Sequence, residues 1–165
     1  MNESVTTWYL EICDRTAISA PKRPPSTPFV IEGQTGRESH WRTSRRMYRE
    51  VGRDWRWTDR LDWSAEQWAE WSTQAETWVV KVDERVAGYV ELHHADQAIE
   101  IAYFGLLPTF HGLGIGGHLL TFALSRGLEV APRVWLHTCS LDGPHALRNY
   151  LARGLRIFRV EVATA

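Results

Sequence analysis

The hydrophobic pattern of the chain predicts strands near both ends and three consecutive strands in the middle. Runs rich in β-branched and aromatic residues, bounded by turn residues, are typical of strands. Such runs cover residues 6–12, 77–82, 86–93, 99–107, 133–138 and 157–162, with a short extended piece at 29–32. The polar residues 83–85 separate two of the central runs, and residues 95–97 separate the next two. The pattern therefore predicts a hairpin followed by a third antiparallel strand.

Helical periodicity and capping residues predict four helices between these strands. Residues 40–51 form the first, with Ser39 as N-cap and Gly52 as its stop, and one face of it carries Trp41, Ser44, Tyr48 and Val51. Residues 64–67 read as a capping box for a second helix that ends by residue 73. Residues 119–128 form the third, and a fourth has Pro144 at its first position and ends at Gly154.

This order of elements predicts an α+β fold. The strand over residues 133–138 should run parallel to the strand over 100–106, because a helix joins them in a right-handed crossover. A chain of 165 residues is expected to form one domain over residues 1–165. No internal repeat or low-complexity segment interrupts it.

Composition and charge narrow the class of protein. The net charge is −1, so the total suggests neither a nucleic-acid nor a membrane partner. The amino terminus has no apolar stretch of the signal-peptide kind, and no run reaches membrane-spanning length. Cys13 and Cys139 lie far apart in apolar contexts. We therefore expect a cytoplasmic protein with reduced, buried thiols.

The most informative segment is a glycine-dense turn between the strand that ends before Pro108 and the third helix. A strand, a glycine turn and a helix in that order create an anion site, because the first N–H groups of the helix have no partners within the helix. Glycine lets phosphate oxygens approach the backbone closely. Gly112-x-Gly114-x-x-Gly117 also matches a dinucleotide fingerprint. That match is disfavoured because it lies late in the chain, without an acidic residue about twenty positions later in the expected place.

Two motifs resemble a known family. His111-x-x-Gly114-x-Gly116 resembles the Gln/Arg-x-x-Gly-x-Gly/Ala signature by which the GNAT superfamily of acyltransferases holds the pyrophosphate of acetyl-CoA. Downstream, Ala146-x-x-x-Tyr150-x-x-x-Gly154-Leu155 is similar to the superfamily's Ala-x-x-x-Tyr-x-x-x-Gly-Phe. The motifs and the elements between them cover roughly residues 86–158. This chain departs from the family in His at 111, Leu at 155, and Gly at 143 where many members carry an asparagine that contacts pantetheine.

The resemblance implies a GNAT-like fold, a mostly antiparallel sheet with one splayed parallel strand pair and flanking helices. It implies acetyl-CoA as acyl donor, with the pantetheine arm in the gap between the splayed strands and a backbone N–H there as oxyanion donor. The residues expected to bind the donor are Phe104, Gly105, Leu106, His111, Gly112, Leu113, Gly114, Gly116 and Gly117.

Two residues are candidates for the proton transfers. Glu100 lies eleven residues before His111, a spacing like that of the glutamate base in histone-acetylating members of the family. A carboxylate can accept the amine's proton if its pKa is raised toward the working pH, but Glu100 could instead face solvent or pair with an arginine. Glu91, His93, His94 and His137 are alternatives for the base. Tyr150 is the candidate acid for the leaving thiolate, against the alternative that it only packs the last helix.

The first two helices and the loop that joins them form a wall of the acceptor pocket in this family. The residues expected to contact the acceptor are Trp55, Trp57, Arg60, Glu91 and His137. Eight arginines lie between Arg37 and Arg60. They are either a basic lip around a phosphate-bearing ligand or a solvated face over an aromatic core.

The sequence thus predicts an N-acyltransferase that moves an acetyl group from acetyl-CoA to a small-molecule amine by direct attack in a ternary complex. One alternative keeps the fold and takes the acyl group from aminoacyl-tRNA, which the arginine cluster could bind. Another is a non-catalytic acyl-CoA-binding module. No metal-ligand spacing is present, so no metal is expected. The acceptor and the oligomeric state, a homodimer included, stay open.

Overall fold

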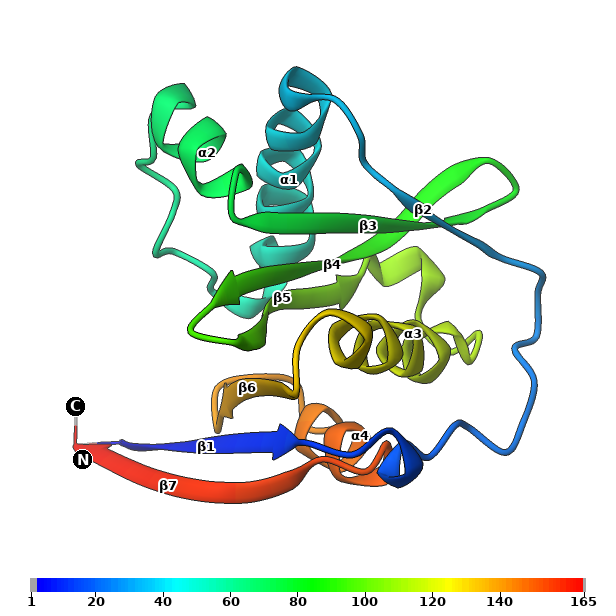
Figure 1. Ribbon diagram of the computed structural model, residues 1–165, viewed down its shortest axis with the longest axis vertical. Coiled ribbons are helices and arrows are strands. Elements are labelled where there is room, and N and C mark those ends of the chain that lie inside the picture. Colours follow the sequence, from blue (N-terminus) through cyan, green and yellow to red (C-terminus); the bar gives the residue numbers. More distant parts are fainter. Residues whose placement is uncertain (1–2, 165) are drawn as a thin grey trace.

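The strands form a single seven-stranded sheet. A computed structural model describes residues 3–164. The sheet has the order β2-β3-β4-β5-β6-β1-β7 (Figure 1). Its members are β1 (Ser4–Ile12), β2 (Val30–Gly33), β3 (Ala75–Val82), β4 (Arg85–Ala95), β5 (Ala98–Leu106), β6 (Arg133–Cys139) and β7 (Arg156–Thr164). Five of the six neighbouring pairs are antiparallel, and β5 and β6 run parallel. The mixed sheet and its parallel pair confirm the predicted fold class.

The four predicted helices are present, with shifted ends. They are α1 (Arg37–Gly52), α2 (Ala65–Ser72), α3 (Ile115–Val130) and α4 (Ala146–Ala152), joined by the short 3₁₀ turns η1 (Arg15–Ala17), η2 (Arg53–Trp55) and η3 (Pro108–Phe110). The capping box of α2 is confirmed, since the Ser64 hydroxyl accepts from the Gln67 N–H and the Gln67 side chain accepts from the Ser64 N–H.

Three predicted helix starts were wrong. Ser39 is not the N-cap of α1, because the helix begins at Arg37, directly after Gly36 at φ 92°. The Ser39 hydroxyl lies within the helix and donates to the Thr35 carbonyl. Helix α3 begins at Ile115, inside the glycine turn, rather than at residue 119. Pro144 lies in the turn before α4 instead of at its first position.

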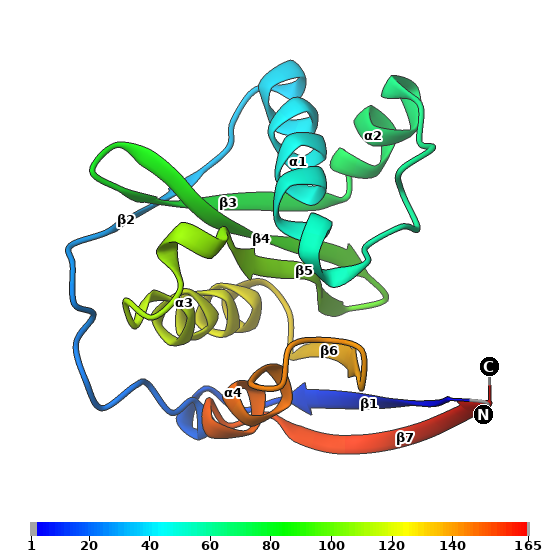
Figure 2. The same ribbon diagram turned by 180° about the vertical axis from the view of Figure 1, so that it is seen from behind.

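The two faces of the sheet carry different helices. On one face α3 buries Leu119, Leu120, Ala123 and Leu124 against alternate residues of the central strands, which include Val90, Leu92 and Ile99. On the other face α1 buries Met47 and Val51 against Val79 and Tyr89. Figure 2 shows α1 crossing β3, β4 and β5. Side chains that alternate along β4 and β5 therefore face either α3 or α1.

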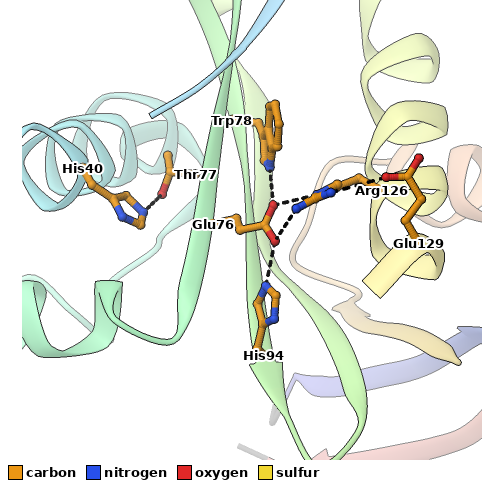
Figure 3. A network of polar contacts seen from close by, with 7 residues as sticks. All are labelled: His40, Glu76, Thr77, Trp78, His94, Arg126 and Glu129. Carbon is orange, nitrogen blue, oxygen red and sulfur yellow. Dashed lines mark hydrogen bonds and ion pairs between the residues drawn. The ribbon is translucent and has the colours of Figure 1, made fainter. Parts of the chain in front are cut away.

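A half-buried carboxylate, that of Glu76, links α3 to the sheet (Figure 3). Glu76 on β3 accepts hydrogen bonds from Trp78 Nε1 and Arg126 Nε, each at 2.9 Å, and its other oxygen lies 2.9 Å from His94 Nε2. Burial favours the neutral acid, but the bonds from Arg126 and Trp78 outweigh it and lower the pKa of Glu76. The network holds α3 in place relative to β3 and β4.

The parallel strands stay together for only three residue pairs. Ala98, Ile99 and Glu100 pair with Arg133, Val134 and Trp135. Beyond this point β5 and β6 separate, and α3 lies between the β3-β4-β5 and β6-β1-β7 parts of the sheet in both views (Figures 1 and 2). β5 also has one extra residue, Ala102, opposite the step from Glu91 to Leu92. Such a bulge reorients the side chains that follow it.

The cysteines differ from expectation. Cys13 is exposed, because it follows directly after the last residue of β1, and Cys139 is half-buried at the end of β6. The prediction that both thiols are buried was therefore wrong. Within residues 3–164, none of the helices is both long and apolar enough to cross a membrane.

Candidate active site

The glycine turn has the backbone geometry of an anion site. Gly112 and Gly114 adopt positive φ, 80° and 77°, a conformation that glycine reaches without steric cost. Gly114 is the N-cap of α3 and supplies no side-chain hydrogen bond to the helix. The first N–H groups of a sixteen-residue helix therefore stay available, with the positive end of its dipole behind them.

The glycines of the turn are needed for different reasons. A Cβ on Gly112 would meet no atom within 4 Å, and one on Gly116 would meet only Leu106 Cδ1, at 3.8 Å. The surface beside these two is therefore open to a ligand. A Cβ on Gly117, in contrast, would lie 2.8 Å from Pro21 Cγ and 3.0 Å from Arg153 Nη1. Gly117 is small because the protein itself fills that space, and its predicted contact with the donor stays a prediction.

His111 is held by the backbone of β5. Its Nε2–H donates to the Leu106 carbonyl oxygen at 2.9 Å, and the residue ends η3. This bond joins the end of β5 to the beginning of the turn. In this arrangement His111 shapes the turn, and its role as a direct ligand of the donor stays a prediction.

A proline-rich segment, residues 20–28, lies across the start of α3, a contact that the sequence analysis does not predict. The Ser26 N–H donates to the Leu113 carbonyl at 2.9 Å, and His118 Nε2–H donates to the Arg23 carbonyl at 3.1 Å. We call residues 20–28 the proline loop. It holds four of the seven prolines. Its contact with α3 depends on tertiary folding, which local pattern does not encode.

The open edge of β5 faces Tyr150. Phe104, Gly105 and Leu106 lie beyond the last β5–β6 pair. The rings of Phe104 and Tyr150 are in edge contact, with centroids 6.3 Å apart. Burial, and then the charge of Asp142, raise the pKa of Tyr150, so its phenol is protonated at neutral pH. The structure thus brings the candidate acid next to the strand expected to bind the pantetheine arm.

Glu100 lies at the point where the strands separate, on the face of the sheet opposite Ile99 and α3. Its carboxylate is 22% exposed, and the Nδ1 atom of His93 lies 3.9 Å from its Oε2 atom. Burial lowers the pKa of His93, which favours the neutral imidazole. Burial raises the pKa of Glu100 and a contribution from Glu91 adds to this, whereas His137 and Arg60 oppose it. A partly exposed carboxylate with a raised pKa can accept a proton from a ligand.

The carboxylate of Glu91, the alternative base, already has hydrogen-bond partners within the protein. It is buried on β4, where it accepts from Arg60 Nη1 at 3.1 Å through both oxygens and from the Ser44 hydroxyl at 3.0 Å. The Arg60 guanidinium in turn lies over several aromatic rings, the nearest being Trp71 at 4.3 Å. Arg60 and Glu91 therefore form a buried ion pair, which supports a structural role for both.

The other predicted acceptor residues are spread around the opening. Trp57 is half-buried against Tyr103, 4.7 Å between ring centroids. Trp55, in η2, reaches across to the loop before α4, since a Cβ on Gly143 would lie 3.0 Å from its indole. His137 on β6 is exposed, and its ring is 5.6 Å from that of Tyr9. Of the five, only His137 is exposed, whereas Trp55 and Trp57 are half-buried and Arg60 and Glu91 are buried.

The arginines of α1 form a partly neutralised surface. A depression of about 460 Å³ on α1 is lined by Trp41, Arg42, Arg45, Arg46, Arg49 and Glu50. Arg42 pairs with Glu38 at 2.6 Å, and Arg46 approaches Glu50 at 4.0 Å. In each pair the two residues lie one helical turn apart on an exposed face, where such pairs contribute little to the free energy of folding. This arrangement favours the solvated-face alternative for this part of the cluster.

Comparison with known proteins gives a family and a fold. The family model described as acetyltransferase (GNAT) family matches residues 40–155. A sequence comparison with curated proteins finds no match.

Three solved structures illustrate the structural likeness. A GCN5-related N-acetyltransferase from Kribbella flavida is 17% identical, with a TM-score of 0.66, over 95% of this chain and 56% of that one. An IAA acetyltransferase from Bacillus cereus is 23% identical, with a TM-score of 0.57, over 80% and 79%. An aminoglycoside acetyltransferase from an uncultured soil metagenomic sample, solved with trehalose, is 14% identical, with a TM-score of 0.61, over 76% and 86%. The chain spans 50–64% of the length of five such structures, the Kribbella protein among them.

Proposed function

We propose that this chain, which belongs to the acetyltransferase (GNAT) family, transfers an acetyl group from acetyl-CoA to the primary amine of a small molecule. The observation that carries the proposal is the separation of β5 from β6 directly after Glu100. It leaves an open strand edge between a glycine turn suited to phosphates and a carboxylate with a raised pKa.

The donor fits the residues that are present. The start of α3 and the positive-φ glycines Gly112 and Gly114 suit a diphosphate. The unpaired edge of β5 from Phe104 to Leu106 suits the amide groups of pantetheine, since a strand edge offers unpaired N–H and C=O groups. When bound, acetyl-CoA supplies an activated acyl group. A backbone N–H of this edge is the proposed donor to the thioester oxygen as charge develops on it.

The proton transfers are assigned to two residues on opposite faces of the sheet. Glu100, on the face that carries α1, accepts a proton from the amine directly or through water. Tyr150, on α4, contacts Phe104 and donates a proton toward the departing sulfur. In the proposed reaction the amine attacks the thioester carbonyl directly, where β5 and β6 separate, with Glu100 serving the amine and Tyr150 serving the leaving sulfur.

An amine screen tests the proposal. Purified protein with acetyl-CoA and a panel of primary amines should release free CoA thiol and yield an acetylated amine by mass spectrometry. Acetyl-CoA binding without turnover across the panel would favour the non-catalytic module. Aminoacyl-tRNA as the only accepted donor, with steeply salt-dependent binding, would favour the RNA-dependent alternative.

A further inference from the structure

Arg153 lies where α4 meets the start of α3. It is the C-cap residue of α4, directly after Ala152. Its N–H donates to the Asn149 carbonyl at 3.1 Å and its carbonyl accepts the Ser19 N–H at 2.9 Å, so both backbone groups are held. Its guanidinium Nη1 lies 3.0 Å from the point that a Cβ on Gly117 would occupy. Gly117 is the third residue of α3. The guanidinium is therefore beside the helix turn whose N–H groups are free.

The charge of Arg153 lacks a partner in the part of the chain that the structure describes. Among residues 3–164, no ion pair includes Arg153. Its Nε is buried without a hydrogen-bond partner, although the residue as a whole is half-buried. A half-buried, unpaired guanidinium beside a positive helix end is unfavourable in the free protein. An anionic ligand at this place would stabilise both the guanidinium and the positive end of the helix.

We propose that Arg153 binds the diphosphate of the acyl-CoA donor, an assignment that rests on the proposed function. A guanidinium presents two parallel N–H groups that match phosphate oxygens, and it holds its charge at any working pH. His111, the residue expected from the sequence to hold this group, donates to the Leu106 carbonyl instead. Arg153 supplies from α4 the positive charge that the turn lacks.

The proline loop sets the direction of approach. Pro21 lies 2.8 Å from the same Gly117 position, and Asn149 Oδ1 lies 3.7 Å from it. Pro21, Asn149 and the Arg153 guanidinium thus lie together beside the start of α3. The diphosphate then meets the helix N–H groups on one side and the guanidinium on the other.

Binding measurements with three ligands test the assignment. Titration calorimetry compares CoA, dephospho-CoA, which lacks the 3′-phosphate, and pantetheine, which lacks all phosphates. Arg153→Gln should weaken CoA and dephospho-CoA by about 10- to 100-fold, the range for hydrogen bonds to a charged group, and leave pantetheine unchanged. Arg148→Gln removes an exposed arginine from the same helix and should leave all three affinities unchanged.

Each other result overturns the assignment. An equal loss for pantetheine would mean that Arg153 only packs the site, and a loss for CoA but not dephospho-CoA would place it at the 3′-phosphate. If Arg153→Gln fails to fold, Arg153→Lys, which keeps the charge and loses the paired N–H groups, must show the same phosphate-dependent loss in smaller degree. A wild-type protein that binds no CoA would overturn the proposed function as well, whereas normal CoA binding by Arg153→Gln overturns this inference alone.

Discussion

Replacing Glu100 and Glu91 in parallel should separate a catalytic carboxylate from a structural one. Both glutamates lie on neighbouring strands and on the same face of the sheet. Glu100→Gln keeps the shape of the side chain and removes its basicity. Turnover should fall by about 10² or more, the range for a positioned general base, while CoA affinity stays unchanged.

The effects on stability should be the reverse of those on turnover, small for Glu100→Gln and large for Glu91→Gln. The pKa of Glu100 in the folded protein is raised above its ordinary value of 4.5, so ionisation of Glu100 costs stability as pH rises through the folded pKa. Glu100→Gln removes that cost and should melt no lower than wild type at neutral pH. Glu91→Gln breaks a buried ion pair and leaves the Arg60 charge uncompensated, a loss on the order of 3 kcal/mol. For a chain of this length that is roughly 6–12 °C in melting temperature.

Turnover and melting temperature should be measured on the same preparations. The kcat/KM of wild type should fall toward low pH with an apparent pKa above 4.5, and Glu100→Gln should lose this limb. A folded Glu100→Gln protein with wild-type turnover at every pH would refute the assignment of the base. A Glu91→Gln protein as stable as wild type would refute the assignment of the ion pair.

Three further variants test other parts of the structure. Tyr150→Phe should lower turnover by about 10² to 10⁴ with CoA affinity kept, and a variant that loses about 1 kcal/mol of stability at normal turnover would limit the hydroxyl to packing. Gly116→Val should fold normally, because the nearest atom to its new Cβ is 3.8 Å away, yet bind CoA at least about 10-fold more weakly; unchanged affinity by calorimetry would argue against the turn as the phosphate site. Glu76→Gln should cost about 1–3 kcal/mol in urea unfolding at neutral pH. Because the pKa of Glu76 is lowered, the difference from wild type should vanish as pH falls through the folded pKa, and a pH-independent difference would contradict the network.

Local sequence signals were sufficient for most of the fold. The hairpin of β3 and β4 follows from two apolar runs and a polar turn, and the parallel β5–β6 pair follows from a helical crossover. The start of α1 could not be predicted this way. Ser39 has the composition of an N-cap, but Gly36 at φ 92° lets the helix begin earlier, and the Ser39 hydroxyl bonds to carbonyls instead of N–H groups.

The local sequence pattern also could not predict which residues pair with the buried charges. Glu91 lies in an apolar strand, which marks it as unusual without saying whether it is a base or half of an ion pair. Its partner Arg60 comes from the loop before α2, and Ser44 comes from α1. Only the packing of α1 and its following loop on β4 brings the three together. A sequence that shows a buried carboxylate therefore predicts a strong interaction and leaves its chemistry open.

The glycine turn shows why a motif locates a site without completing it. Gly112 and Gly114 are glycines because the turn requires positive φ there, which the order of strand, turn and helix in the sequence predicts. Gly117 follows from contacts with Pro21 and Arg153, which lie far before and after it in the chain. Pro21 comes from the proline loop and Arg153 follows the last residue of α4. The motif thus predicts the backbone part of the proposed phosphate site, and only the fold brings the charged side chain of Arg153 beside it.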